Sequence, residues 1–309
     1  MQSDRVVGSV LALALGDAFG APYEGGIVER LLWALIGKRH GKRRWTDDTQ
    51  MILDLIGSLV ARGGVDQDDL AARFARSYHW SRGYGPGTAK VLKRIRRGQP
   101  WEKARRAVYP EGSFGNGGAM RAPAVGLFFS PEGEDEVVRA AWATAAVTHA
   151  HPLGRRGAEL IALATALSLQ DAGPLRIADR LGRCARSREF ADRLRIAETW
   201  LRGQEIAPSK EVARKLGNGI TAPESCVTSI YAALAFREHS FEELPNYIIQ
   251  LGGDVDTIAA MAGAIWGAAR GKGALPASHL DQLDRRQEVE TAGGSLARTA
   301  VKPHELGHW

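Results

Sequence analysis

The sequence predicts an all-α protein that folds as a single domain. Segments with apolar residues at three- and four-residue steps recur along the chain, whereas strict alternation of apolar and polar residues is almost absent. Most of these segments are rich in alanine, poor in β-branched residues and separated by short turns that contain glycine or proline. In a chain of 309 residues, of which 44% are hydrophobic, this pattern indicates a dozen or more helices around a sizeable core.

The elements can be placed in order along the chain. The first apolar run, residues 6–15, does not resemble a secretion signal, because Asp4 lies in its basic flank and Asp17 interrupts it before any cleavage site. Residues 25–45 are rich in basic side chains, and we expect a mobile connection there rather than a firm helix. Helical periodicity is clearest at residues 51–60, 68–80, 134–147, 158–169, 225–236 and 258–269.

The end of the chain has a weaker pattern. Residues 1–286 are expected to form the domain, and residues 287–309, where apolar periodicity is thin, a C-terminal extension that is loosely docked. No run of about eighteen apolar residues occurs, so we expect no transmembrane helix.

Cysteine usage and charge limit the class of protein. Cys184 and Cys226 are far apart and have no His or Cys at metal-ligand spacing, which argues against a disulfide framework or a zinc site and favours the cytoplasm. The formal net charge of +6 comes largely from basic clusters at residues 38–44, 93–97 and 103–106. These clusters favour anionic partners, but without interleaved aromatic residues or a known module they are read first as a solvated surface.

Two predicted helix starts each carry a pair of aspartates beside threonine. Asp47 and Asp48 stand between Thr46 and Thr49, just before the helix at 51–60. A single side-chain oxygen is enough to cap a helix. A second carboxylate gains little from the helix dipole, because the two negative charges repel each other. Capping alone is therefore a weak explanation for this pair.

The second pair consists of Asp254 and Asp256, followed by Thr257 and the helix at 258–269. Either pair alone is compatible with a capping residue and a surface acid. Taken together, they offer the hard oxygen ligands that Mg²⁺ or Mn²⁺ prefers. The two helix starts therefore predict a site for one or two divalent cations.

A glycine-rich segment at residues 112–118 precedes another apolar helix. Its backbone N–H groups could cradle a pyrophosphate, because glycine permits close approach and a helix start is electropositive. An ordinary turn is the alternative. Phe114, and Tyr109 before it, are candidates to stack on an adenine base, with core packing as the alternative for both.

In combination, these motifs resemble the ADP-ribosylglycohydrolase family. The two acidic motifs at 46–49 and 252–257 carry the resemblance, and four other segments also resemble family signatures: residues 16–24, 115–121, 148–152 and 217–220. Together they span about residues 6–271. The resemblance implies a compact single-domain orthogonal helical bundle and a hydrolase that cleaves the glycosidic bond between ADP-ribose and an acceptor. It also implies a binuclear centre of two Mg²⁺, or Mn²⁺, ions.

The same resemblance implies roles for individual residues. Glu24 would activate the attacking water and Asp256 would bridge the metals, with Asp47 and Asp48 completing the catalytic group. The implied metal ligands are Thr46, Asp47, Asp48, Asp254, Asp256, Thr257 and Glu24. The implied substrate-binding residues are Gly112, Ser113, Phe114, Gly115, Asn116, Gly117 and His149. Asp17, inside an apolar helix, is interpreted as a structural or supporting residue.

The amino-acid sequence at residues 22–24, 115–121 and 252–264 is most similar to that of the branch that acts on serine-linked ADP-ribose and poly(ADP-ribose). The expected partners are ADP-ribosylated proteins or small molecules that contain ADP-ribose, such as esters, with no specific nucleic acid, no membrane and a monomeric state. Two related alternatives are an ADP-ribosyl-arginine hydrolase of the dinitrogenase-reductase-activating type and a catalytically silent ADP-ribose-binding protein. A basic helical protein that binds nucleic acid is a third, but it leaves the acidic pairs unexplained.

Overall fold

Seventeen α-helices account for most of residues 2–300, the part of the chain that this computed structural model describes, apart from the side chains of residues 27–29 and 32. The helices are α1 (Gln2–Gly20), α2 (Ile27–Ile36), α3 (Asp47–Arg62), α4 (Gln67–Ser77), α5 (Pro86–Arg96), α6 (Trp101–Val108), α7 (Pro123–Phe129), α8 (Glu134–Ala146), α9 (Pro152–Leu169), α10 (Pro174–Cys184), α11 (Arg188–Gly203), α12 (Ser209–Lys215), α13 (Ala222–Ala235), α14 (Glu243–Leu251), α15 (Val255–Arg270), α16 (Ala277–Gln282) and α17 (Arg286–Ala300). An antiparallel pair, β1 (Lys38–Arg39) and β2 (Lys42–Arg43), and five short 3₁₀ turns complete the described elements. The all-α prediction is confirmed.

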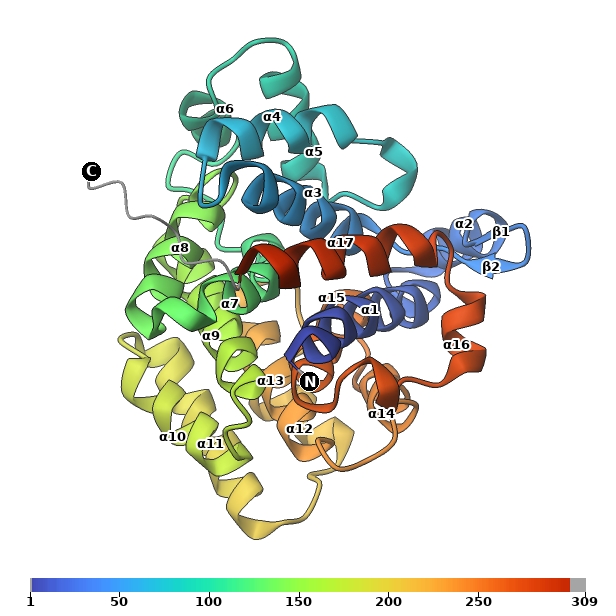
Figure 1. Cartoon of the computed structure of the whole chain (residues 1–309), viewed down its shortest axis with the longest axis vertical. Coiled ribbons are helices and arrows are strands. Elements are labelled where there is room, and N and C mark those ends of the chain that lie inside the picture. Colours follow the sequence, from blue (N-terminus) through green and yellow to red (C-terminus); the bar gives the residue numbers. More distant parts are fainter. Residues whose placement is uncertain (1, 301–309) are drawn as a thin grey trace.

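The centre of the molecule is the pair α1 and α15, which lie side by side (Figure 1). Small residues let the two backbones approach closely: a Cβ atom on Gly16 would lie 2.2 Å from the carbonyl oxygen of Ala259, and one on Gly263 would lie 2.4 Å from that of Ala12. Helices with larger side chains at these positions would have to separate. This contact fixes the position of the start of α15, where one acidic pair lies.

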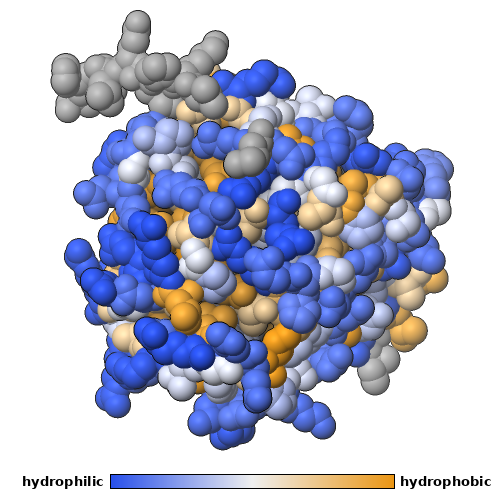
Figure 2. Space-filling model, turned by 60° about the horizontal axis from the view of Figure 1, so that its bottom comes forward, coloured by the Kyte–Doolittle hydropathy of each residue, from blue (hydrophilic) through white to orange (hydrophobic). Residues whose placement is uncertain are grey.

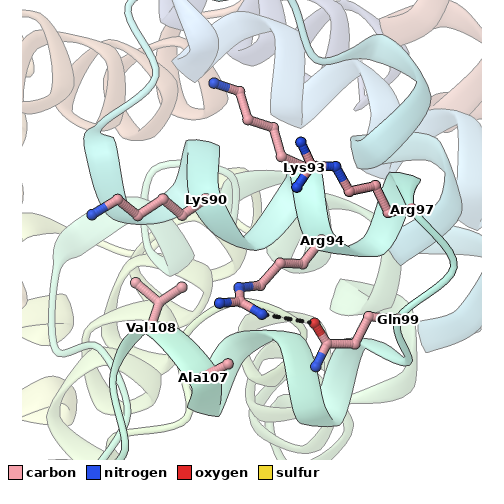
Figure 3. Close-up of a pocket in the computed structure, with 7 residues that line it drawn as sticks. All are labelled: Lys90, Lys93, Arg94, Arg97, Gln99, Ala107 and Val108. Atoms are coloured by element: carbon pink, nitrogen blue, oxygen red, sulfur yellow. Dashed lines mark hydrogen bonds between the residues drawn. The ribbon is translucent and has the colours of Figure 1, made fainter.

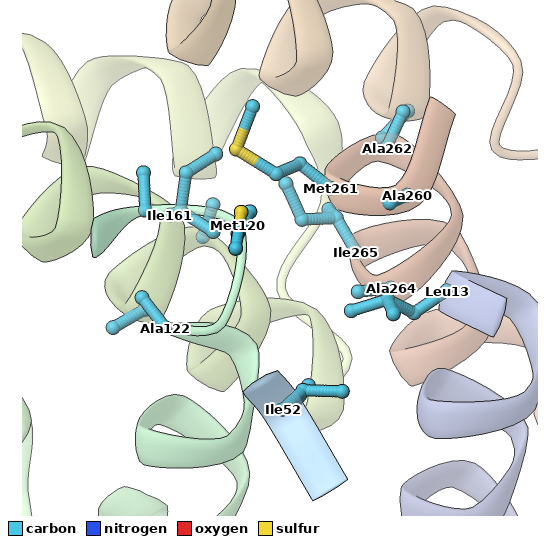
Figure 4. Packing of buried hydrophobic residues seen from close by; sticks show 14 of the residues in the cluster. Leu13, Ile52, Met120, Ala122, Ile161, Ala260, Met261, Ala262, Ala264 and Ile265 are labelled. Atoms are coloured by element: carbon cyan, nitrogen blue, oxygen red, sulfur yellow. The ribbon is translucent and has the colours of Figure 1, made fainter. Parts of the chain in front are cut away.

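Other helices pack around this pair. Figure 1 shows α3 to α6 on one side and α8 to α11 on another, with α13 packed against both α9 and α15. Figure 4 shows buried side chains from different helices meeting in the core, among them Leu13 of α1, Ile52 of α3, Ile161 of α9 and Met261 of α15. The core thus connects both helix starts that carry the acidic pairs.

The C-terminal segment differs from the loosely docked extension expected for residues 287–309. Residues 286–300 form α17, which packs on α1, α3 and α7 and buries Val289, Leu296 and Ala297. The sequence pattern is weak here because two of the contact positions are occupied by Gly293 and Ala297, which have no large apolar side chains. Residues 301–309 lie outside the described residues.

Residues 25–45 also differ from the expectation, because they contain a helix rather than only a connection. α2 spans ten residues and is followed by the β1–β2 hairpin, and both lie at the edge of the molecule in Figure 1. Leu31 and Leu35 of α2 are exposed. The apolar face of α2 is therefore not fully used by the core, and the basic residues after it obscured its helical pattern.

The first helix is the longest apolar element. α1 and the turn after it have the length and hydropathy that could cross a membrane, but 83% of the apolar window is buried inside the protein. It is therefore the central core helix of this fold. On the face shown in Figure 2, hydrophilic residues predominate and hydrophobic patches lie between them.

Candidate functional site

The two acidic helix starts come together in space. One oxygen each of Asp17, Asp48 and Asp256 lie within 4.8 Å of one another, and so do one oxygen each of Glu24, Asp254 and Asp256. Asp256 belongs to both groups of three. A direct contact joins the two helix starts, because the Thr257 hydroxyl donates a hydrogen bond of 3.2 Å to Asp48 Oδ2.

Asp17 holds the first helix start in place. Its carboxylate, fully buried on α1, accepts hydrogen bonds from the backbone N–H of Thr46 at 2.9 and 3.0 Å and from that of Thr49 at 3.0 Å. The Thr49 hydroxyl donates to it as well, at 2.5 Å. Thr46 in turn caps α3, accepting from the N–H of Asp48 at 3.3 Å. Asp17 thus satisfies backbone groups that a free helix start leaves without partners.

The second helix start is braced by two asparagines. The side-chain N–H group of Asn116 donates to Asp254 Oδ2 at 2.5 Å and to the Ser225 hydroxyl at 3.0 Å. The backbone N–H of Asp254 donates to the carbonyl of Asn218 at 2.8 Å. Gly253 lies directly against that carbonyl, with a positive φ of 75° and no room for a Cβ atom, so only glycine suits this turn.

The carboxylates lie in an environment that disfavours their charge. Burial raises the pKa of Asp17 to about 6, and burial together with the charge of Glu24 raises that of Asp254 to about 6. The pKa values of Asp47, Asp48 and Asp256 are also raised well above their usual range, first by burial and then by the surrounding carboxylates. No lysine or arginine of the described residues forms an ion pair with these five groups.

These observations fit a divalent cation. Asp48 Oδ1 is buried without a hydrogen-bond partner, so the cluster contains a free acceptor of high negative potential. The donor set consists of carboxylate and hydroxyl oxygens only, which is the ligand chemistry of Mg²⁺ and Mn²⁺. A bound cation would offset the repulsion between the carboxylates, which is strong because the groups are buried.

A cleft of about 330 Å³ opens onto this cluster. Asp47, Asp254, Asp256 and Thr257 reach its wall, and Glu24, half-buried after a short 3₁₀ turn (Ala21–Tyr23), lines it as well. Other parts of the wall come from residues 83–88, 113, 115–117 and 148–149. Thr46 and Asp48 do not line the cleft and lie behind its surface, buried among the ligand candidates.

The glycine-rich segment forms one wall of the cleft around His149. A Cβ atom on Gly117 would lie 2.8 Å from the His149 ring, so the glycine lets the loop lie against the imidazole. The Thr148 hydroxyl lies 2.7 Å from His149 Nδ1. Burial, and after it the charge of Arg121, lowers the pKa of His149 to about 3. The imidazole is therefore neutral at physiological pH and can exchange hydrogen bonds with a ligand without adding charge.

Arg121 supports this wall from within the protein. Its side chain is fully buried and donates to the carbonyl of Gly117 and to the Thr148 hydroxyl, the latter at 2.8 Å. The guanidinium also lies over the ring of Phe74, 4.9 Å from its centroid. Arg121 therefore connects the glycine-rich loop with the segment that carries His149.

Two of the predicted substrate-binding residues lie outside the cleft lining. Phe114 is exposed to 47% and its ring packs edge-on against His151, with 5.4 Å between ring centroids. Gly112 lies against the backbone of His151 with a positive φ of 89°, which indicates a packing role. Ser113, Gly115, Asn116, Gly117 and His149 do line the cleft. Tyr109, the second aromatic candidate, lines it too.

One cleft segment was missed at the sequence level. Residues 83–88 contribute Tyr84 and Thr88 to the wall, and Tyr109 packs onto Gly87, which has no room for a side chain. The segment reads Gly-Tyr-Gly-Pro-Gly-Thr and runs into the first turn of α5, which begins at Pro86. Two glycines before a helix start and a third in its first turn were the available signal for a second ligand-binding loop.

A larger cavity of about 690 Å³ lies between α5 and α6, outside the acidic cluster. Figure 3 shows that Lys90, Lys93, Arg94 and Arg97 surround it. Arg94 donates a hydrogen bond of 3.2 Å to Gln99, but the cavity has no carboxylate in its lining. It corresponds to the second basic cluster of the sequence and shares no lining residue with the acidic cluster among the described residues.

Known proteins resemble this chain over nearly its whole length. The family model described as ADP-ribosylglycohydrolase matches residues 1–305, which include both acidic helix starts. The ADP-ribosylhydrolase ARH3 of Mus musculus is 34% identical over 95% of this chain and 91% of that protein, and ARH3 of Homo sapiens is 36% identical over 84% and 79%. A solved structure titled ADP-ribosylglycohydrolase-related protein complex superposes with a TM-score of 0.66, at 28% identity over 97% of this chain and 99% of that one.

Proposed function

The chain belongs to the ADP-ribosylglycohydrolase family and is a hydrolase of ADP-ribose glycosidic bonds, and from this premise we propose that it releases ADP-ribose from serine-modified proteins with two divalent cations. Poly(ADP-ribose) and small ADP-ribose esters are further proposed substrates. The relatives named ADP-ribosylhydrolase ARH3 support this class of reaction. The serine linkage is proposed from the sequence of the motifs at residues 22–24, 115–121 and 252–264.

The observation that carries the proposal is the position of Asp256. It is the one carboxylate common to both groups of three, Asp17–Asp48–Asp256 and Glu24–Asp254–Asp256, in the described residues. A binuclear centre needs a ligand that reaches both ions, and a shared carboxylate supplies it. We therefore assign Asp256 as the bridge. We assign the remaining ligand positions to Thr46, Asp47, Asp48, Asp254, Thr257 and Glu24.

The residues at the cleft would have different roles in the reaction. Two bound cations would supply positive charge that holds ribose hydroxyls and orients a water near the anomeric carbon. Glu24 lines the cleft beside the cluster and would take a proton from that water. Asp17 acts as a positioning residue, because its hydrogen bonds fix the backbone of Thr46 and Thr49. Cleavage would pass through an oxocarbenium-like state at the distal ribose.

The other walls of the cleft suit the ADP part of the substrate. Gly115 and the short 3₁₀ turn Asn116–Gly118 that follows it border the cleft, where glycine would allow a phosphate to approach the backbone. His149 is neutral and faces this turn. Tyr109, which packs onto Gly87, provides an aromatic ring in the cleft lining, so we place the adenine base beside Tyr109 rather than Phe114.

The state of the two cysteines bears on the location of the protein. Both cysteines are free, which suits a reducing compartment such as the cytoplasm. We propose that the protein acts there as a monomer.

Release of ADP-ribose from defined peptides tests the function. Peptides ADP-ribosylated on serine or on arginine are incubated with the protein in Mg²⁺ or in EDTA, and free ADP-ribose is measured by chromatography. We expect release from the serine peptide in Mg²⁺ only, with Asp47→Ala as the inactive control. Release from the arginine peptide alone would support the dinitrogenase-reductase-activating type instead. Binding of ADP-ribose without release from either peptide would indicate a silent binding protein.

A further inference from the structure

A second, smaller cavity adjoins the cleft on the far side of Glu24. It has a volume of about 190 Å³, and Trp33, Ile36 and Trp80 provide its large apolar walls. Glu24 and Gly83 line both this cavity and the cleft, and Thr46 reaches its wall as well. The cavity therefore borders directly on the proposed metal ligands.

Two segments provide the large apolar side chains of this cavity, which we call the indole cavity. Trp33 and Ile36 belong to α2, whereas Trp80 begins the 3₁₀ turn Trp80–Arg82 after α4. Arg44 ties the two segments together: its guanidinium donates to the carbonyl of Ile36 at 2.9 Å and to the Ser81 hydroxyl at 3.2 Å. The cavity is thus held by a specific contact between two elements that are distant in sequence.

The proposed reaction indicates which part of the substrate binds in this cavity. The groups that suit ADP-ribose, including Ser113, Gly117 and His149, line the cleft and not the indole cavity. The scissile bond must lie at the carboxylates. The acceptor therefore has to extend from that bond in a direction away from the groups that suit ADP-ribose. We propose that the indole cavity is the acceptor subsite and receives an apolar side chain next to the modified residue of a polypeptide. This inference rests on the proposed function.

The composition of the walls supports an apolar occupant. Among the described residues, Glu24 is the only charged one in the lining, and a negatively charged neighbour in the substrate would be repelled by it. Two indole rings and Ile36 offer contact area to a leucine or an aromatic ring. Trp80 is exposed to 67%, so its indole is accessible to a bound chain. A polypeptide can span from this surface to the catalytic centre.

The test compares three substrates: serine-ADP-ribosylated peptides with leucine or glycine on both sides of the modified serine, and free ADP-ribosyl-serine. We expect the wild-type protein to have a kcat/KM at least fivefold higher for the leucine peptide than for the glycine peptide. Trp33→Ala and Trp80→Ala should reduce this ratio to below twofold, while Trp80→Phe retains most of it. Leu35→Ala is the matched control, because Leu35 lies on the same helix α2, is exposed to 82% and does not line the cavity.

Each other outcome counts against the inference. A wild-type protein without preference between the two peptides overturns it, and so does a preference that survives both alanine variants. An equal loss of kcat/KM on all three substrates in Trp80→Ala would indicate a structural role for the indole instead. If the wild-type protein releases no ADP-ribose from any substrate, the proposed function fails first and the subsite with it. Release from all three without a leucine preference refutes the subsite alone.

Discussion

Asp256 lies where the two groups of candidate ligands overlap, and its charge is costly to the protein without metal. Burial and the charges of Glu24 and Asp48 raise its pKa well above the usual range. We predict that Asp256→Asn raises the melting temperature of the protein in EDTA by a few degrees, because a buried repulsion is removed. The same variant should lose hydrolysis and the stabilisation that Mg²⁺ gives the wild type.

Thermal unfolding in EDTA and in Mg²⁺ measures both effects of this substitution. Asp135→Asn, on the exposed start of α8, is the control and should behave as the wild type in both buffers. An Asp256→Asn protein that gains as much stability from Mg²⁺ as the wild type would exclude Asp256 as a ligand.

Glu24 differs from the other acids because it follows a 3₁₀ turn rather than standing at the start of a long helix. It should therefore matter more for turnover than for binding. We predict that Glu24→Gln binds ADP-ribose in Mg²⁺ with nearly unchanged affinity, since size and hydrogen-bonding capacity are kept. Its single-turnover rate should fall by about 10²-fold or more, which is typical of a missing general base.

Calorimetry and rapid-quench kinetics on the same Glu24→Gln preparation separate these two quantities. Normal turnover would remove Glu24 from the mechanism, and loss of ADP-ribose binding would make it a binding residue.

At the scale of elements, α3 and α4 share a buried carboxyl outside the metal site. Asp54 on α3 accepts hydrogen bonds from the hydroxyl of Ser77, the last residue of α4, and from Gln50 at 3.4 Å. Burial raises its pKa from the usual 3.8 to about 7. The folded protein therefore binds a proton at Asp54 between about pH 4 and pH 7 that the unfolded chain has released. Its contribution to stability is complete below pH 4 and is lost as the pH rises through 7.

Asp54→Asn should remove this pH dependence. We predict that the free energy of unfolding of the variant, relative to the wild type, increases between pH 5 and pH 8. Urea titrations of both proteins in EDTA measure it, and the carboxylates of the metal site contribute equally to both. Parallel stability curves over this range would show that Asp54 keeps an ordinary pKa.

At the scale of the whole molecule, the close packing of α1 and α15 determines the position of everything else. Gly16→Ala would place a Cβ atom 2.2 Å from the carbonyl oxygen of Ala259, so the helices must separate. We predict a loss of about 1–3 kcal/mol or more in the free energy of unfolding by urea. It should be accompanied by weaker Mg²⁺ binding, because α1 carries Asp17 and α15 begins at the second acidic pair.

Gly182→Ala is the matched control for this glycine. Gly182 lies on the exposed face of α10 with nothing within 4 Å of its Cβ position, so alanine should stabilise the protein by up to about 1 kcal/mol. If Gly16→Ala were as stable as Gly182→Ala, close backbone packing would not govern this pair.

The sequence contained enough to place six of the seventeen described helices by their periodicity, α3, α4, α8, α9, α13 and α15, and to point to the acidic pairs. Periodicity located α3, α8, α9, α13 and α15 to within a few residues at most ends. It missed α2 and α17, since the first is followed by a basic hairpin and keeps leucines exposed, and the second packs through small residues such as Gly293. Periodicity is weakest where a helix packs through small residues, as α17 does, or where its flanks are strongly charged, as those of α2 are.

By itself the sequence determined the all-α class, the two acidic helix starts and the family, because periodicity, charge and motif order are local properties of the chain. Only the tertiary structure decided that Asp256 lies beside both Asp48 and Glu24, that Asp17 holds α3 from another helix, and that Phe114 lies outside the cleft. It also decided that residues 83–88 and the indoles of Trp33 and Trp80 border the site. These relations join residues far apart along the chain, and they arise from the packing of α1 on α15, which no local pattern encodes.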